Sequence, residues 1–370
     1  MTPDIPPPWP DTLFPADPYP GLRPPVSFVH EDPADGAGVT RQLRADPSVP
    51  SGLRVDGVCL DGWLRERGVA PSAGRVPVLA YGSNANPSKI SWMRAERGLT
   101  GPVVVLHVRT EELSAVWSAG HRVVDGQRPA TLVAAPGAVE THALWLAAPD
   151  QFAALDAVEG RTADPPRYRL ARVATGAVRL TDGGGVIDRP YAYVAPVEPT
   201  GEQRTDRRPL LVDGAAVPCS AVGQVAARSL RGVPSGDGLD AVTVDGVPDP
   251  DAWPSRVFVY GSLMPGEDAW GQIAEHAAPG STPRAAVLPD AAVADTGHGY
   301  PALTLGGDGV PGYVVELADP VAALPVLDRY EGPEYRRIRI TLPDGAVCWA
   351  WLWIADRAGH RPLPRGWVAR

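Results

Sequence analysis

The sequence has few of the residues that usually mark a disulfide-rich, metal-binding or nucleic-acid-binding protein. Its three cysteines, Cys59, Cys219 and Cys348, are far apart and form no CxxC motif. Lys89 is the single lysine among 34 basic residues, which face 43 acidic ones and leave a net charge of −9. We therefore expect neither a disulfide framework nor an electrostatic surface for nucleic acid or an anionic membrane.

The sequence also lacks the common cofactor motifs. Seven histidines are scattered along the chain, and there is no HExxH, GxGxxG or Walker sequence. No apolar run approaches the roughly 18–20 residues that cross a bilayer. The N-terminal residues lack the basic and apolar regions of a secretory signal. These absences predict a cytoplasmic protein and give no sign of a metal or nucleotide site.

Proline and glycine, in contrast, are abundant, with 43 and 40 residues. They favour turns and short elements over a helical bundle. A chain of 370 residues exceeds what one hydrophobic core usually serves, so two domains are expected. Short strand-like runs, with a helix inserted late in each half, predict the α+β class, each domain being a small mixed or barrel-like sheet with short helices.

Two motifs occur twice, in the same order. Tyr-Gly-Ser ends an apolar run at Tyr81 and again at Tyr260, and the sequence LDxxEG follows each time, with its glutamate at Glu159 and at Glu331. The tyrosines are 179 positions apart and the glutamates 172. A nearly constant offset indicates a tandem duplication of one domain.

The duplication predicts four regions in the chain. Residues 1–74 are a proline-rich N-terminal arm, and residues 75–200 are the first domain. Residues 201–254, with one expected helix, are a linker or an embellishment of the first domain, and residues 255–370 are the second domain.

The Tyr-Gly-Ser sequence predicts a tight loop after a strand. Glycine permits a sharp change of direction, so that several main-chain N–H groups can point into one concavity and hold a carboxylate or an oxyanion. A simple turn without a ligand would give the same short sequence.

The LDxxEG sequence predicts a helix that ends at glycine, one residue after the glutamate. A carboxylate near a helix C-terminus is electrostatically unfavourable, which would raise its pKa toward that of a general base working near neutrality. The alternative is a solvated surface glutamate without a role.

Together and duplicated, these motifs resemble the γ-glutamylcyclotransferase superfamily. The first copy, with YGSN and LDAVEG, is similar to the γ-glutamylcyclotransferase branch. The second, with YGSL, DTGHGYPAL and DRYEGPEYRR, is similar to the γ-glutamylamine cyclotransferase branch.

The resemblance implies a carbon–nitrogen lyase that cyclises a small γ-glutamyl compound to 5-oxoproline and releases an amine, without a metal or other cofactor. It implies Glu159 and Glu331 as the general acid/base groups. The residues it implies for substrate binding are Tyr81, Gly82, Ser83, Asn84 and Tyr168 in the first domain, and Tyr260, Gly261, Ser262, Leu263 and Tyr335 in the second.

Two departures from the shared pattern bear on these roles. Seven residues separate Gly160 from Tyr168, whereas two separate Gly332 from Tyr335. Leu263 replaces an asparagine, so any amide contact made by Asn84 should be missing in the second domain. The released amine and the oligomeric state stay open, and so does the alternative that one or both domains only bind a small acidic ligand.

Overall fold

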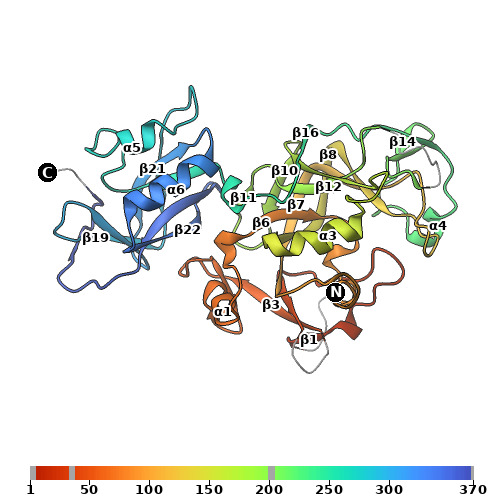
Figure 1. Cartoon of the computed structure of the whole chain (residues 1–370), viewed down its shortest axis with the longest axis horizontal. Helices are drawn as coiled ribbons and strands as arrows, with labels where there is room; N and C mark the ends of the chain where they lie inside the picture. The colour runs from red at the N-terminus through yellow and green to blue at the C-terminus, as the bar shows by residue number, and fades with distance from the viewer. Residues whose placement is uncertain (1–5, 33–37, 199–204, 368–370) are drawn as a thin grey trace. The chain divides into compact units, whose positions relative to one another are not determined.

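The computed structural model describes residues 6–32, 38–198 and 205–367. The chain forms two compact units that are interleaved along the sequence (Figure 1). Unit 1 comprises residues 1–43, 75–181 and 187–248, and unit 2 comprises residues 44–74, 182–186 and 249–370. The four regions expected from the sequence stay a prediction; the first 74 residues are divided between the two units.

Unit 1 is built on a mixed sheet with strand order β16-β9-β12-β6-β8-β7-β2-β3. Its strands and helices are β1 (Trp9–Pro10), η1 (Asp11–Leu13), β2 (Phe28–Glu31), β3 (Val39–Ala45, continuing into unit 2), β6 (Val76–Ala80), η3 (Ser83–Ala85), α2 (Pro87–Arg97), β7 (Val103–Trp117), β8 (Ala130–Ala147), η4 (Pro149–Gln151), α3 (Phe152–Glu159), β9 (Arg169–Val173), β10 (Ala177–Leu180), β12 (Tyr191–Val194), β13 (Leu210–Val212), β14 (Ala215–Ala216), α4 (Gln224–Ala227), β15 (Val233–Pro234) and β16 (Ala241–Thr243).

Unit 2 is built on a five-stranded sheet with order β18-β21-β17-β23-β22. Its elements are β4 (Leu53–Val55), β5 (Val58–Cys59), α1 (Leu60–Glu66), η2 (Ser72–Gly74), η6 (Pro250–Ala252), β17 (Arg256–Val259), α5 (Gly271–Ala274), β18 (Arg284–Leu288), β19 (Ala291–Asp295), β20 (Pro301–Leu305), β21 (Val310–Glu316), α6 (Pro320–Glu331), β22 (Tyr335–Thr341), β23 (Val347–Trp353) and β24 (Arg361–Pro362). The short strand β11 (Val186–Ile187) lies where the chain passes from unit 2 back to unit 1.

The two sheets share one pattern around their central strands. In unit 1, β6 pairs in parallel with β12 and antiparallel with β8. In unit 2, β17 pairs in parallel with β23 and antiparallel with β21. β12 and β23 each pair antiparallel with the strand that follows the LDxxEG helix, β9 or β22. The α+β class is therefore confirmed, and within the described residues the unit 2 sheet is open, with β18 and β22 at its edges.

The sequence explains the two helices that end at Glu159 and Glu331. In α3, Phe152 and Leu155 lie on one face and are buried in a core that also contains the β6 side chains. Gly160 ends the helix in the left-handed conformation, with φ 65°, where a side chain would be strained. In α6, Leu324 and Leu327 are buried in the same way, and Gly332 ends that helix. Helix ends therefore set the positions of Glu159 and Glu331.

Two elements differ from the sequence prediction. The strand β8 (Ala130–Ala147), which includes ATLVAAP and HALWLA, is a single long strand where the sequence predicts short ones. Helix α2 (Pro87–Arg97) was not predicted, although Asn86 caps its first turn, Pro87 opens it and Gly98 ends it in the left-handed conformation. None of the helices in the described part of the chain is long and apolar enough to cross a bilayer.

Candidate active site

The Tyr-Gly-Ser loops follow the central strand of each sheet and are held by their tyrosines. The Tyr81 hydroxyl donates a hydrogen bond to the carbonyl oxygen of Tyr193 on β12. The Tyr260 hydroxyl donates to the carbonyl oxygen of Trp351 on β23, the corresponding strand of unit 2. Burial raises the pKa of both phenols well above the ordinary value, so they stay protonated donors. These tyrosines anchor the loop and do not offer their hydroxyl protons to a ligand.

The loops present main-chain donors without acceptors. Within the described residues, the N–H groups of Gly82, Ser83 and Asn84 donate to no protein atom, and the same holds for Gly261, Ser262 and Leu263. Three unpaired amide protons on one tight turn form a site for an oxygen atom that carries negative charge. The binding roles that the sequence suggests for these loop residues stay predictions.

The aspartate of LDxxEG fixes the helix end to the sheet. Asp156 accepts a hydrogen bond of 2.7 Å from the Tyr193 hydroxyl, and Asp328 accepts one of 2.9 Å from Trp351 Nε1. Tyr193 and Trp351 are the same residues whose carbonyls hold the loop tyrosines. Each unit therefore uses one residue of the parallel neighbouring strand to position both the loop and the glutamate helix, a role that sequence reasoning missed.

Glu159 lies beside its loop in unit 1. Its Oε1 accepts a hydrogen bond of 2.6 Å from Asn84 Nδ2. Burial raises the pKa of Glu159, while the Asn84 hydrogen bond and the positive charges of Lys89, Arg167 and Arg207 partly offset the increase. The unit 1 glutamate is thus sheltered but surrounded by groups that favour its ionised form.

Glu331 lies in a small pocket of unit 2 that is lined by Tyr260–Leu263, Tyr300, Pro301, Tyr335 and Trp351. Within the described residues no side chain donates a hydrogen bond to Glu331, and Leu263 stands where Asn84 donates to Glu159 in unit 1. Burial, and then repulsion from the Asp328 carboxylate, raise the pKa of Glu331 to about 8. Burial, and not the helix-end effect that the sequence suggested, is the first cause in both units.

The second tyrosine of each motif has matching contacts in the two units. The Tyr168 hydroxyl donates to the Ala130 carbonyl at 2.7 Å, and the Tyr335 hydroxyl donates to the Pro301 carbonyl at 2.7 Å. Ala130 and Pro301 are the first residues of β8 and β20. Despite the different spacing in the sequence, Tyr168 and Tyr335 therefore occupy corresponding positions at the start of a strand.

The surroundings of the two sites differ in chemistry. In unit 1, Tyr19 of the N-terminal segment and Cys219 of the 206–230 segment share a hydrophobic cluster with Tyr81. In unit 2, the rings of Tyr300, Tyr335 and Trp353 pack together, with the Tyr335 and Trp353 centroids 5.0 Å apart. Sequence reasoning treated the N-terminal segment and the 201–254 region as outside the first site. The lone tyrosine at position 19 gave no signal of its own.

Comparison with known proteins finds a family model that resembles part of unit 2. Residues 257–369 match the family model described as gamma-glutamyl cyclotransferase, AIG2-like. No curated protein matches the chain.

Solved structures similar to the chain have low sequence identity and low TM-scores. The uropathogenic Escherichia coli-specific protein c4763 is 20% identical over 30% of this chain and 87% of its own, with a TM-score of 0.27. The Escherichia coli protein ytfP is 26% identical over 30% of this chain and 94% of its own, with a TM-score of 0.24. Allophanate hydrolase from Kluyveromyces lactis is 13% identical over 63% of this chain and 31% of its own, with a TM-score of 0.25.

The loop, the buried glutamate and the family match all fall within residues 257–369 of unit 2. This segment of the chain is similar to the gamma-glutamyl cyclotransferase, AIG2-like family.

Proposed function

We propose that the protein cyclises a γ-glutamyl compound, releasing 5-oxoproline and a free amine, and that both units carry the activity. The proposal is carried by one pairing that occurs in each unit. In each unit, a glutamate with a raised pKa lies at the end of a helix. One residue of the neighbouring strand binds both this helix and the loop that has three unpaired amide protons.

The reaction joins two ends of one molecule. The α-amine of the γ-glutamyl group attacks its own γ-carbonyl carbon, a C–N bond forms to close a five-membered ring, and the C–N bond to the departing amine breaks. Because the attack is intramolecular, holding the substrate folded supplies much of the acceleration, with effective molarities of roughly 10⁵ M or more in well-oriented cases. The loop amides would stabilise the negative charge that develops on the γ-carbonyl oxygen.

The glutamate would carry the proton. It removes a proton from the α-ammonium group, which makes the nitrogen nucleophilic, and returns it to the departing nitrogen. An ordinary glutamate lies about 3.5 pKa units below an α-amine, an uphill transfer of roughly 5 kcal/mol. A pKa of about 8 for Glu331 nearly removes this mismatch.

The test measures 5-oxoproline from a panel of γ-glutamyl amino acids, peptides and amines. Glu159→Gln leaves the unit 2 site as the source of product, and Glu331→Gln leaves the unit 1 site. Because each removes a general base, we expect each variant to lose its own unit's turnover by about 10²–10⁴-fold and the double variant to lose both.

Glu334→Gln is the matched control, since this neighbouring glutamate is exposed and lies outside the pocket. A chain that binds γ-glutamyl compounds but forms no 5-oxoproline from any of them would show a binding module in place of an enzyme.

A further inference from the structure

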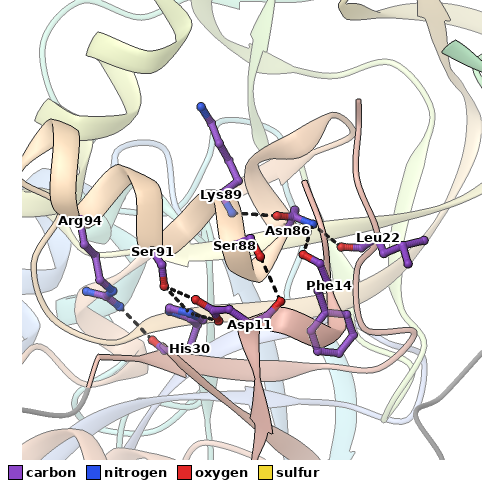
Figure 2. Close-up of polar contacts among 9 residues, drawn as sticks. All are labelled: Asp11, Phe14, Leu22, His30, Asn86, Ser88, Lys89, Ser91 and Arg94. Carbon is purple, nitrogen blue, oxygen red and sulfur yellow. Dashed lines mark hydrogen bonds and ion pairs between the residues drawn. The ribbon is translucent and has the colours of Figure 1, made fainter. Parts of the chain in front are cut away.

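The N-terminal segment of unit 1 is fastened to helix α2, directly after the Tyr-Gly-Ser loop. The Asn86 side chain caps α2 by accepting a hydrogen bond from the Lys89 N–H at 2.7 Å. Its amide nitrogen donates to the carbonyl oxygens of Phe14, at 2.9 Å, and Leu22 (Figure 2). One buried side chain therefore both starts the helix and holds the segment.

A second group of contacts fastens the beginning of this segment. Asp11 accepts hydrogen bonds from the hydroxyls of Ser88, through its carbonyl, and Ser91, through its carboxylate (Figure 2). The buried His30 lies 3.0 Å from the Asp11 carboxylate. The segment is thus fixed to α2 on both sides of residues 15–21.

The fastened segment carries Tyr19 to the first site. The Tyr19 N–H donates to Gln127 Oε1 at 2.8 Å, and the Tyr19 hydroxyl accepts a hydrogen bond from the Ala130 N–H at 3.1 Å. The hydroxyl is so close to Gly82 that a methyl group added there would lie 2.6 Å from it. Tyr168 donates to the carbonyl of the same Ala130, so both hydroxyls meet at the start of β8.

The corresponding place in unit 2 is apolar. A methyl group added to Gly261 would lie 2.5 Å from Cγ of the Pro301 ring, which covers that loop as the Tyr19 hydroxyl covers Gly82. Pro301 has no proton to donate. The two units therefore share the glutamate and the loop amides but differ in the group above the glycine.

The Tyr19 hydroxyl has a proton to offer. It accepts from Ala130, but its own proton goes to no acceptor within the described residues. Burial raises the pKa of Tyr19 above its ordinary value, so the hydroxyl stays protonated over the working pH range. A buried donor without an acceptor is costly unless a ligand supplies one.

From this geometry we infer that Tyr19, carried into the site by the N-terminal segment, is a substrate-contacting residue of unit 1 and donates a hydrogen bond to a substrate oxygen held over Gly82. That oxygen belongs to the γ-carbonyl or to the α-carboxylate of the glutamyl group. The inference rests on the proposed function, and it adds to the site a residue whose place above the loop glycine is taken by Pro301 in unit 2.

The experiment uses the full chain with Glu331→Gln, so that product comes from unit 1. Tyr19→Phe keeps the ring and removes the donor, and we expect kcat/KM for γ-glutamyl-alanine and γ-glutamyl-ethylamide to fall by roughly 10- to 100-fold. A fall in kcat identifies contact with the developing oxyanion, whereas a rise in KM identifies contact with the α-carboxylate. Tyr330→Phe, at an exposed position of unit 2, is the matched control.

This design distinguishes failure of the inference about Tyr19 from failure of the proposed function. Unchanged kcat/KM in Tyr19→Phe, with product still formed and only the melting temperature lowered, would reduce Tyr19 to a packing residue and overturn the inference. If the Glu331→Gln parent forms no product at all, the proposed function fails for unit 1. In that case, calorimetry of γ-glutamyl-alanine binding tests the inference about Tyr19. The inference predicts weaker binding by Tyr19→Phe than by the parent.

A pair of substitutions tests the contact between Tyr19 and Gly82 by thermal stability, without an activity assay. Gly82→Ala should lower the melting temperature, because the new methyl group meets the Tyr19 hydroxyl. Tyr19→Phe should relieve that effect, since the ring carbon beneath the hydroxyl would be 3.7 Å away. Equal destabilisation by Gly82→Ala in both backgrounds would contradict the position assigned to the hydroxyl.

Discussion

Unit 1 and unit 2 each have a glutamate at the end of the LDxxEG helix, but the electrostatic surroundings of the two glutamates differ. Glu159 accepts a hydrogen bond from Asn84 and lies among three positive side chains, whereas Glu331 faces Asp328 and aromatic rings. Both pKa values are raised by burial, but only in unit 1 do neighbouring groups work against the increase. The comparison teaches that a duplicated motif preserves the position of a side chain without preserving its proton affinity.

The largest consequence of this difference should appear in the pH dependence of turnover. Glu331 must be ionised to accept a proton, so with Glu159→Gln the kcat/KM should rise tenfold per pH unit up to about pH 8. At pH 6 it should be roughly 100-fold below its plateau. With Glu331→Gln, the corresponding rise should lie at lower pH, because Asn84 and the three cations favour ionised Glu159. Profiles that coincide would remove the distinction between the two sites.

Reciprocal substitutions should move the two profiles toward each other. Asn84→Leu removes the hydrogen bond to Glu159, so its pKa should increase and the unit 1 profile should shift to higher pH. Leu263→Asn should shift the unit 2 profile to lower pH if the new amide reaches Glu331. We expect a shift of about one pH unit in each case, or about tenfold in rate on the acidic limb.

The control for these exchanges is a residue of similar size outside the site. Leu22→Asn tests the same chemical change at an exposed position of unit 1 and should leave both profiles in place. A shift of the unit 1 profile by Leu22→Asn would mean that the exchanges act through general destabilisation.

The smallest expected effect concerns stability. A carboxyl group whose pKa rises on folding stabilises the protein below its unfolded pKa, here about 4.5, and this stabilisation is lost as the pH rises through about 8. Glu331→Gln should therefore increase the free energy of unfolding at pH 8.5 relative to the parent, on the order of 1 kcal/mol after solvent screening, and should have little effect near pH 4.5. Thermal unfolding of both proteins across this pH range measures the difference. A parent that is more stable than the variant at pH 8.5 would contradict the sign.

The sequence predicted the parts of the site that depend on local chemistry. Gly160 and Gly332 end helices, and the YGS loops follow apolar strands, because glycine conformation and strand periodicity are local properties. The raised pKa of both glutamates was also expected, although its main cause, burial, depends on the packed structure.

The sequence could not predict the contacts made by distant segments. Nothing near Tyr19 indicates that its hydroxyl lies against Gly82, and no local pattern links Asp156 to Tyr193 or Asp328 to Trp351. Helix α2 is a different case, since Asn86, Pro87 and Gly98 are recognisable start and stop signals that were available in the sequence.

Because the two units alternate along the sequence, they cannot be separated into simple fragments. Each unit is assembled from three separate stretches, so a single cut, whether by a protease or between two recombinant fragments, cannot free either one whole. A fragment starting at residue 75 would keep Glu159 and its loop yet leave behind residues 11–22, which Asn86 and Ser88 hold in the intact chain. Inactivity of such a fragment would therefore say nothing about the catalytic competence of unit 1, and point substitutions in the full-length protein are the sound way to separate the two sites.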